Sequence, residues 1–485
     1  MEIKNKLIKN TLFNFIVRLW NILLSFLLFP FIVIHIGKHA AAVWILLSSI
    51  NAYFQIFDIA FSVSLIKYTS EFYAKKEFDK INEYINTSFI IFAVSGIVVF
   101  FCLLILKIFV NDLFHIPLEL QEETGTVIMI TAVFTLFIIP FSVFRNVIVG
   151  LQRFDITSHV DFYISSLQLI FTVFFLIKGF GLTSLIIINS SAAAISIIIF
   201  MIYVKKLLPS FRFLFRNLKK ETVKDISQLS ISMFIINISS FIINKTDQIL
   251  IGIFLPIQNI TFYSAGFKIY QGAGKIPLIL LQAIMPASSE LNALDQKAEL
   301  KKIFFFSTRY TTALMTPVAI TAIIFAKDIL RLWMGTEFEP HSAVIQILVL
   351  NLFFLFLHQA GGQILVGLNK VKEIIPYYWI IMISNIVLSI ILVHFIELKG
   401  IAWGTTIPFI FMEFFYLKYL FKQLEITWKE FFSNIIFKVY VPGIFILGIN
   451  LAILHWFRFE NIIILIGYFF LIGLVYLGVF YSAFL

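Results

Sequence analysis

Long apolar segments fill almost the whole chain and leave few folds open to it. A helix of about 20 mostly apolar residues is long enough to cross the hydrocarbon core of a bilayer, and the sequence contains about fourteen such runs. Hydrophobic residues make up 60% of the 485 positions and charged residues 13%, whereas soluble domains have about 45–50% and about 25%. The sequence therefore predicts an all-α integral membrane protein whose main solvent is lipid.

Short polar or charged segments separate the predicted spans. The seventh and eighth spans contain more polar residues than the third, so their hydropathy is weaker. The predicted spans lie near residues 11–36, 41–66, 85–110, 125–149, 156–178, 182–204, 226–254, 259–286, 304–326, 342–367, 374–396, 401–421, 432–455 and 461–484.

Basic residues are distributed unevenly between the two sides of these spans. The N-terminus and the even-numbered gaps, such as 67–84 and 205–224, are rich in Lys and Arg, whereas the gap between the third and fourth spans has neither. Since positively charged loops stay in the cytoplasm, both termini are expected on the cytoplasmic side of a bacterial inner membrane. This distribution assigns the net charge of +10 to loops rather than to nucleic-acid binding. The N-terminus has no small-residue cleavage site, so the first span is expected to be a retained anchor.

The sequence also repeats itself. The segment SEFYA at 70–74 matches SELNA at 289–293 in the second half of the chain. The segment VIVGL at 147–151 resembles ILVGL at 364–368, and the offset between these two is nearly the same as for the first pair. Matches in the same order at nearly one spacing predict two related halves of six spans each.

This repeat predicts the domain organisation. A third pair, Gly181 and Gly400, has the same offset as SEFYA and SELNA. Because six is an even number, both halves insert in the same orientation, and the axis that relates them is a pseudo-twofold axis along the membrane normal. Two such bundles enclose a central cleft, which rocking exposes to each side in turn. The predicted domains are an N-terminal six-helix bundle (1–204), a basic cytoplasmic linker (205–224), a C-terminal six-helix bundle (225–421) and an additional two-helix hairpin (422–485).

Charged residues inside the spans mark the lining of the predicted cleft. A charge at the bilayer centre costs at least about 2.5–3.5 kcal/mol, so such a residue usually faces a cavity or a partner. Neighbouring Asn, Gln and Ser residues fall at helical spacing and extend these positions into stripes. The charged residues far from the span ends are Arg18, Lys245, Lys268 and Lys275, together with the acidic Asp58 and Asp247.

Some charged residues have simpler explanations. Arg145 lies about one helical turn from a cytoplasmic end, where its guanidinium can extend to the interface, and Lys245 and Asp247 can neutralise each other. Glu413 is expected to be structural or to extend to the interface, and scattered histidines such as His358 are expected to be structural. The metal pattern HExxH and the GxSxG and P-loop patterns are absent from the sequence, so no metal site is expected.

Four segments together resemble Wzx-type polysaccharide flippases, which belong to the superfamily of the multidrug MATE exporters and the lipid II flippase. The run 244–291 (NKTDQILIGIF…IMPASSEL) is similar to the seventh and eighth helices of these proteins. The run 35–77 (HIGKHAAAVW…SEFYAKKE) and the turns GLQRFD at 150–155 and GLNK at 367–370 are similar as well. The resemblance covers most of the chain, but its motifs are loose.

The resemblance implies a twelve-helix core, here with two additional helices, and a transporter rather than an enzyme. The implied activity is export of undecaprenyl-pyrophosphate-linked oligosaccharide units to the external leaflet, for surface polysaccharide such as the O-antigen of lipopolysaccharide. The implied partners are this lipid-linked substrate, membrane lipids, a polysaccharide polymerase and a chain-length regulator.

A cationic cleft agrees with this substrate. Arg binds a pyrophosphate through paired hydrogen bonds and Lys binds it as a point charge, while amide side chains suit sugars. Asp58 and Asp247 are predicted to bind a coupling cation, Na+ or H+, and no other cofactor is expected. The predicted substrate-binding residues are Arg18, Lys268, Lys275, Lys245, Arg145, Asn14, Asn21, Gln55, Asn244 and Gln271.

Three other functions remain open at this point. A MATE-type cation-coupled drug antiporter would favour an acidic cleft, because its substrates are cations. A membrane enzyme would need a catalytic pair or a sizeable external loop, whereas all the predicted external gaps are short. A passive scaffold or channel does not explain the internal repeat.

Overall fold

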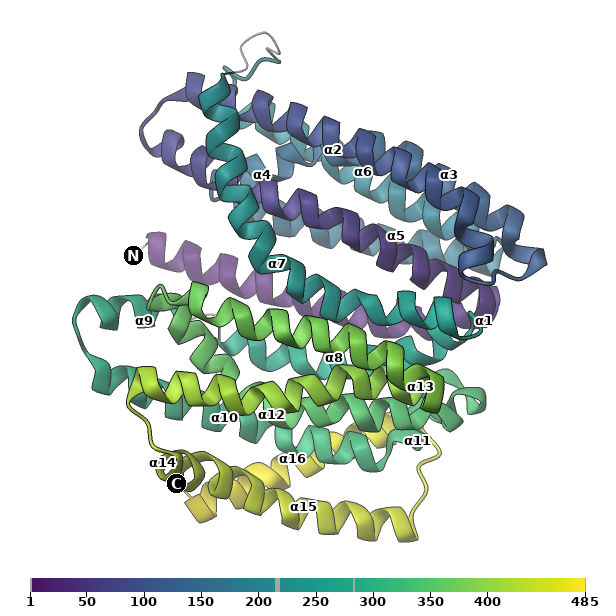
Figure 1. The fold of residues 1–485 in the computed structure, drawn as a ribbon, viewed down its shortest axis with the longest axis vertical. Coiled ribbons are helices and arrows are strands. Elements are labelled where there is room, and N and C mark those ends of the chain that lie inside the picture. The colour runs from purple at the N-terminus through teal and green to yellow at the C-terminus, as the bar shows by residue number, and fades with distance from the viewer. Residues whose placement is uncertain (1, 214–218, 282–283, 485) are drawn as a thin grey trace. The chain divides into compact units, whose positions relative to one another are not determined.

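The computed structural model describes residues 2–213, 219–281 and 284–484, and every regular element among them is helical (Figure 1). The chain divides into two compact units, Met1–Thr261 (unit 1) and Phe262–Leu485 (unit 2). Within the described residues, nine helices are long and apolar enough to cross a membrane, or ten if the bent pair Lys297–Ile324 and Ala326–Met334 is one span. The predicted all-α membrane fold is thus confirmed, while the count of fourteen and the pseudo-twofold axis stay predictions.

The described residues of unit 1 form seven complete helices. Helix α1 covers two predicted spans, because Gly37 interrupts it with a φ of 78° that glycine adopts without steric cost. The predicted fourth span is divided at Ser142 into α3 and α4. The bounds are α1 (Glu2–Ala74), α2 (Phe78–Leu113), α3 (Leu118–Phe141), α4 (Val143–Gly150), α5 (Phe154–Ile177), α6 (Leu182–Leu207) and α7 (Lys220–Phe254).

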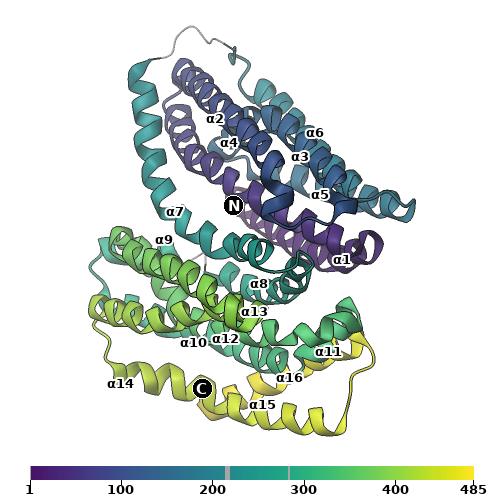
Figure 2. The same cartoon turned by 45° about the vertical axis from the view of Figure 1, so that its right-hand side comes forward.

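The short helix α4 is the centre of the core of unit 1. Its Val143, Phe144, Val147 and Ile148 are fully buried, and it contacts α1, α5 and α6. Helix α1 in turn packs against both α5 and α7, as Figure 2 shows. The apolar side of α4 therefore faces this core, while its Arg145 is partly exposed.

Polar contacts fix the start of α7 to the start of α2. Lys219 Nζ donates to Glu83 Oε2 at 2.6 Å, and the Tyr84 hydroxyl donates to Asp225 Oδ2 at 3.0 Å. The hydrogen bond to Glu83 raises the pKa of Lys219 above its usual value, so this ammonium stays charged. The chain therefore enters α7 from a fixed position on unit 1.

Unit 2 contains most of α8 and all later helices. Helix α13 covers two predicted spans, because Ile396 and Glu397 leave the helical conformation. The bounds are α8 (Asn259–Leu281), α9 (Ile284–Ala293), α10 (Lys297–Ile324), α11 (Ala326–Met334), the 3-10 helix η1 (Thr336–His341), α12 (Ser342–Gly367), α13 (Val371–Leu424), α14 (Trp428–Phe431), the π-helix η2 (Phe432–Ile436), α15 (Phe437–Trp456) and α16 (Ile462–Phe484).

The break in α13 turns this helix back on itself as a hairpin. Asn385 Nδ2 before the break donates to Thr405 Oγ1 after it, at 2.9 Å. A β-carbon on Gly404 would overlap Ser389, so the two arms approach as closely as glycine permits. This is the small-residue packing that holds helices together in lipid, where no hydrophobic force acts between them.

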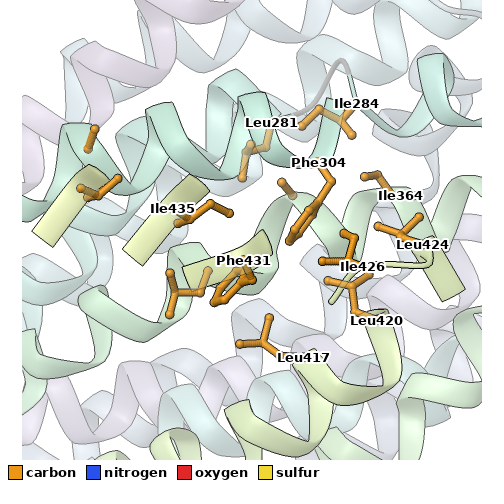
Figure 3. Packing of buried hydrophobic residues seen from close by; sticks show 14 of the residues in the cluster. Leu281, Ile284, Phe304, Ile364, Leu417, Leu420, Leu424, Ile426, Phe431 and Ile435 are labelled. Atoms are coloured by element: carbon orange, nitrogen blue, oxygen red, sulfur yellow. The ribbon is translucent and has the colours of Figure 1, made fainter. Parts of the chain in front are cut away.

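The core of unit 2 joins the α13 hairpin to the last two helices. Figure 3 shows Phe304 of α10, Leu420 of α13 and Phe431 of α14 in one buried cluster, which also includes Tyr476 of α16. Asn450 of α15 adds a buried polar link, because its Nδ2 donates to Thr321 Oγ1 of α10 at 3.3 Å. The additional hairpin predicted at 422–485 is therefore packed into the same unit as α10.

The sequence repeat has a structural counterpart in each unit. A β-carbon on Gly150, in VIVGL, would approach Thr69 Cβ to 2.7 Å, and one on Gly367, in ILVGL, would approach Ser288 Cβ to 2.8 Å. Thr69 and Ser288 directly precede SEFYA and SELNA. The repeated segments thus form the same glycine contact in each unit. The predicted domain boundaries themselves stay predictions.

Candidate functional site

In unit 1, the predicted polar stripes of α1 and α7 lie on neighbouring segments. The hydroxyl groups of Tyr53 on α1 and Thr246 on α7 share a short hydrogen bond. This bond brings the part of α1 that carries Gln55 against the part of α7 that carries Asp247. The side chain of Gln55 is exposed, whereas that of Asp247 is fully buried.

The remaining predicted residues of unit 1 divide into three groups. Asn244 and Lys245 on α7 are half-buried, and Asn21 on α1 is exposed. Arg145 on α4 lies elsewhere, because its Nη2 donates to Asp161 Oδ2 on α5 at 2.9 Å. Asn14, Arg18 and Asp58 lie on α1, but their side chains are outside the part of the chain that the structure describes.

In unit 2, the predicted basic residues lie on one side of α8. Lys268, Gln271 and Lys275 are separated by three and four positions, which is the spacing of one helix face. A β-carbon on Gly266 would approach Val344 Cγ1 of α12 to 2.9 Å, so the glycine side of α8 packs on α12. Lys268 follows Gly266 by two positions and therefore projects from roughly the opposite side.

The α8 lysines are thus turned away from the packed core of unit 2. Lys275 is exposed, and Lys268 and Gln271 are half-buried. Two ammonium groups on one helix face can bind a phosphorylated group, since each donates charge-assisted hydrogen bonds. Whether these lysines bind a substrate stays a prediction.

Unit 2 also contains a buried acid–base pair that the sequence did not predict. His358 Nδ1 on α12 lies 2.5 Å from Glu413 Oε2 on α13, and the two residues are each 5% exposed. The sequence predicted a structural place for each residue without pairing the two, and the burial of Glu413 shows that it does not extend to the interface. The signal in the sequence was weak, because the two residues are 55 positions apart on different spans.

Tyrosine rings surround this pair. The ring of Tyr416 lies 4.8 Å from the His358 ring, and the ring of Tyr377 lies 5.8 Å from that of Tyr416. Within the described residues, no group of three or more His, Cys, Asp or Glu side chains has a metal-binding arrangement. Two neighbouring basic and acidic atoms such as His358 Nδ1 and Glu413 Oε2 can share a proton.

Comparison with known protein families identifies two overlapping matches. The model of a family described as polysaccharide biosynthesis protein matches residues 7–292, and the MatE model matches residues 229–391. The first match includes all of unit 1 except its first six residues and continues through α8 into α9.

Similar sequences come from archaea and bacteria. An uncharacterized membrane protein of Methanocaldococcus jannaschii is 22% identical over 86% of this chain and 82% of its own length. A probable low-salt glycan biosynthesis flippase of Haloferax volcanii is 22% identical over 40% of this chain and 42% of its own. A putative O-antigen transporter of Shigella flexneri is 24% identical over 30% and 36%, respectively.

Solved structures show the fold. The lipid II flippase MurJ in an inward closed conformation matches 97% of this chain and 98% of its own with a TM-score of 0.75, at 15% sequence identity. An inward-facing multidrug resistance MATE family transporter matches 84% and 94% with a TM-score of 0.69, at 13% identity. The chain therefore has the transporter fold that these two proteins share.

Proposed function

Because the chain belongs to the polysaccharide biosynthesis protein family, we propose that it is a flippase for undecaprenyl-pyrophosphate-linked oligosaccharide units. The observation that carries this proposal is the stripe of Lys268, Gln271 and Lys275 on α8, which is turned away from the core of unit 2. The names of the Haloferax and Shigella relatives, a glycan flippase and an O-antigen transporter, support the same substrate class.

In this proposal the α8 lysines and Arg18 hold the pyrophosphate, while the amides of Asn14, Asn21, Gln55, Asn244 and Gln271 contact the sugars. The two six-helix bundles rock about a cleft and expose it alternately to the cytoplasm and to the outside. The lipid tail stays in the bilayer throughout. Both termini lie in the cytoplasm, and a polymerase and a chain-length regulator receive the exported unit.

The membrane potential alone favours this direction of transport. Moving one elementary charge across 100 mV is worth about 2.3 kcal/mol, and a cell interior that is negative expels a pyrophosphate. Asp58 and Asp247 add a coupling site for Na+ or H+ in this scheme. Arg145 has a lesser part, since Asp161 already holds its guanidinium at 2.9 Å.

Reconstitution tests the proposal directly. Purified chain is placed in liposomes that contain the lipid-linked oligosaccharide, and lectin binding measures the sugar that reaches the opposite leaflet. The double substitution Lys268→Gln/Lys275→Gln should slow this transfer about tenfold or more. Each hydrogen bond to a charged group contributes about 1.5–3 kcal/mol, and about 1.4 kcal/mol corresponds to a factor of ten.

A matched control removes the same charge elsewhere. Lys205→Gln/Lys206→Gln neutralises two exposed lysines at the end of α6 and should leave the rate unchanged. Arg18→Gln should behave like the α8 double variant. Transfer at the wild-type rate by the α8 variant would refute the site, and transport of a cationic drug in place of the glycan would favour the MATE-type antiporter.

A further inference from the structure

Two apolar helices of unit 2 bury a pair of titratable side chains, a histidine and a glutamate. His358 lies on α12 and Glu413 on α13, and both helices belong to segments that are apolar enough to cross a bilayer. The side chains are 7% and 5% exposed, and Nδ1 lies 2.5 Å from Oε2. Ionisable residues in such positions are rare and usually functional, since hydrocarbon strongly disfavours charge.

The geometry fits a pair that holds one proton in common. With one shared proton the pair is neutral overall, which is the charge state that a buried site tolerates best. Glu413 Oε1 is buried and has no hydrogen-bond partner within the described part of the chain. An ionised carboxylate would leave that oxygen without compensation, so a carboxyl group that donates from Oε2 to Nδ1 fits better.

Few other groups influence this proton. The titratable groups that interact electrostatically with Glu413 are His358 of α12, Tyr378 and Tyr416 of α13, and Tyr440 of α15. The three tyrosines are uncharged at ordinary pH. Glu413 Oε2 lies 2.5 Å from His358 Nδ1, so the charge of the pair depends first on the proton between these two atoms.

The pair lies in a tightly packed part of the contact between α12 and α13. A β-carbon on Gly361, three positions after His358, would overlap Leu420 of α13. The side chains of the pair are only 7% and 5% exposed, so little of the pair is open to water while these helices stay in contact. Loss of the shared proton would leave a net negative charge that needs water, so deprotonation and separation of α12 from α13 favour each other.

From this linkage we infer that His358 and Glu413 form a proton-binding site in unit 2, through which a proton gradient drives the transport cycle. One proton from one aqueous side binds between Nδ1 and Oε2 as the helices close, and the same proton leaves to the other side as they open. The inference rests on the proposed transport function for the last step only, because proton binding itself is a property of the pair.

Infrared difference spectroscopy of the full chain in lipid nanodiscs tests the binding step. Wild-type protein should lose a protonated-carboxyl band between acid and alkaline pH. The band should be absent from Glu413→Gln, which keeps the shape of the side chain, and displaced in His358→Gln. Glu119→Gln, at an exposed carboxyl of α3, should leave it in place. An identical difference spectrum from wild type and Glu413→Gln would overturn the inference.

Transport with and without a pH gradient tests the coupling step. In liposomes that contain the lipid-linked oligosaccharide, a gradient should accelerate the wild type, and Glu413→Gln should transport at one rate under both conditions. Asn450→Ala removes a buried interhelical bond without a titratable group, so it should slow transport but keep the response to the gradient. A merely structural role for Glu413 predicts that Glu413→Gln also keeps this response, which would overturn the coupling.

The two experiments separate this inference from the proposed function. A carboxyl band that titrates in a chain that moves no glycan would contradict the proposed substrate and leave the proton site standing. Glycan transport at the wild-type gradient response in Glu413→Gln would contradict the coupling through this pair and leave the flippase standing.

Discussion

Arg145–Asp161 in unit 1 and His358–Glu413 in unit 2 are both acid–base pairs between neighbouring helices, but they differ in burial. The side chains of the first pair are 47% and 38% exposed, and those of the second are 7% and 5% exposed. Exposed ion pairs contribute about 0–1 kcal/mol, whereas breaking a buried pair costs about 3–5 kcal/mol. Loss of the exposed pair in unit 1 should therefore change stability little, whereas loss of the buried pair in unit 2 should change it strongly.

The repeat sharpens this contrast. At the spacing that relates Gly150 to Gly367, Phe141 corresponds to His358. At the spacing that relates SEFYA to SELNA, Ala194 corresponds to Glu413. Unit 1 therefore has apolar residues where unit 2 has the titratable pair. The two halves therefore share the glycine contact, but only the second half has titratable side chains at these positions.

The largest expected effect comes from breaking the buried pair. His358→Leu leaves the Glu413 carboxyl group without its partner, and the free energy of unfolding should fall by about 3 kcal/mol. The double variant His358→Leu/Glu413→Leu should recover most of this loss, because apolar residues of similar volume often replace a buried pair without cost. Denaturant unfolding in mixed micelles measures both. Additive losses in the double variant would show that the two residues act independently.

A smaller effect is expected at the two glycine contacts, and it should be similar in both units. Gly150→Ala forces a β-carbon against Thr69, and Gly367→Ala forces one against Ser288 and the Met285 carbonyl oxygen. Overpacking of this kind costs about 1–3 kcal/mol. Gly448→Ala, where nothing lies within 4 Å, serves as the control and should stabilise the helix slightly. If only one of the two substitutions lowers the free energy of unfolding, the repeated segments do not contribute equally to packing in the two units.

Much of this fold could be predicted from the sequence, because hydropathy and glycine are local signals. The interruption at Gly37 falls between two predicted spans, and the one at Ile396–Glu397 falls at the end of the span 374–396. The SEFYA and VIVGL repeats correspond to a real contact. The division of the fourth span at Ser142 was not predicted, although Pro140 inside this span is a residue that can kink a helix. The 76° bend between α10 and α11 falls at the end of the predicted span 304–326, and α11 beyond it was not predicted as a helix.

The candidate site could be predicted less well, because it depends on which helix faces meet. The one-sided arrangement of Lys268, Gln271 and Lys275 follows from helical spacing alone. The pairing of His358 with Glu413 does not, since each is a single polar residue in an apolar span until α12 and α13 are packed together. The partner of Arg145 was missed for the same reason, although Asp161 is only 16 positions away.

The smallest expected effect comes from the exposed pair of unit 1. Asp161→Asn removes the charge that faces Arg145, and the free energy of unfolding should change by less than about 1 kcal/mol, because solvent screens a half-exposed pair. Transport in the liposome assay separates the two roles predicted for Arg145. If its guanidinium only satisfies Asp161, Arg145→Gln and Asp161→Asn should have equally small effects on the transfer rate. If it also binds the pyrophosphate, Arg145→Gln should slow transfer while Asp161→Asn leaves it unchanged or faster, because the released guanidinium keeps its charge for the substrate.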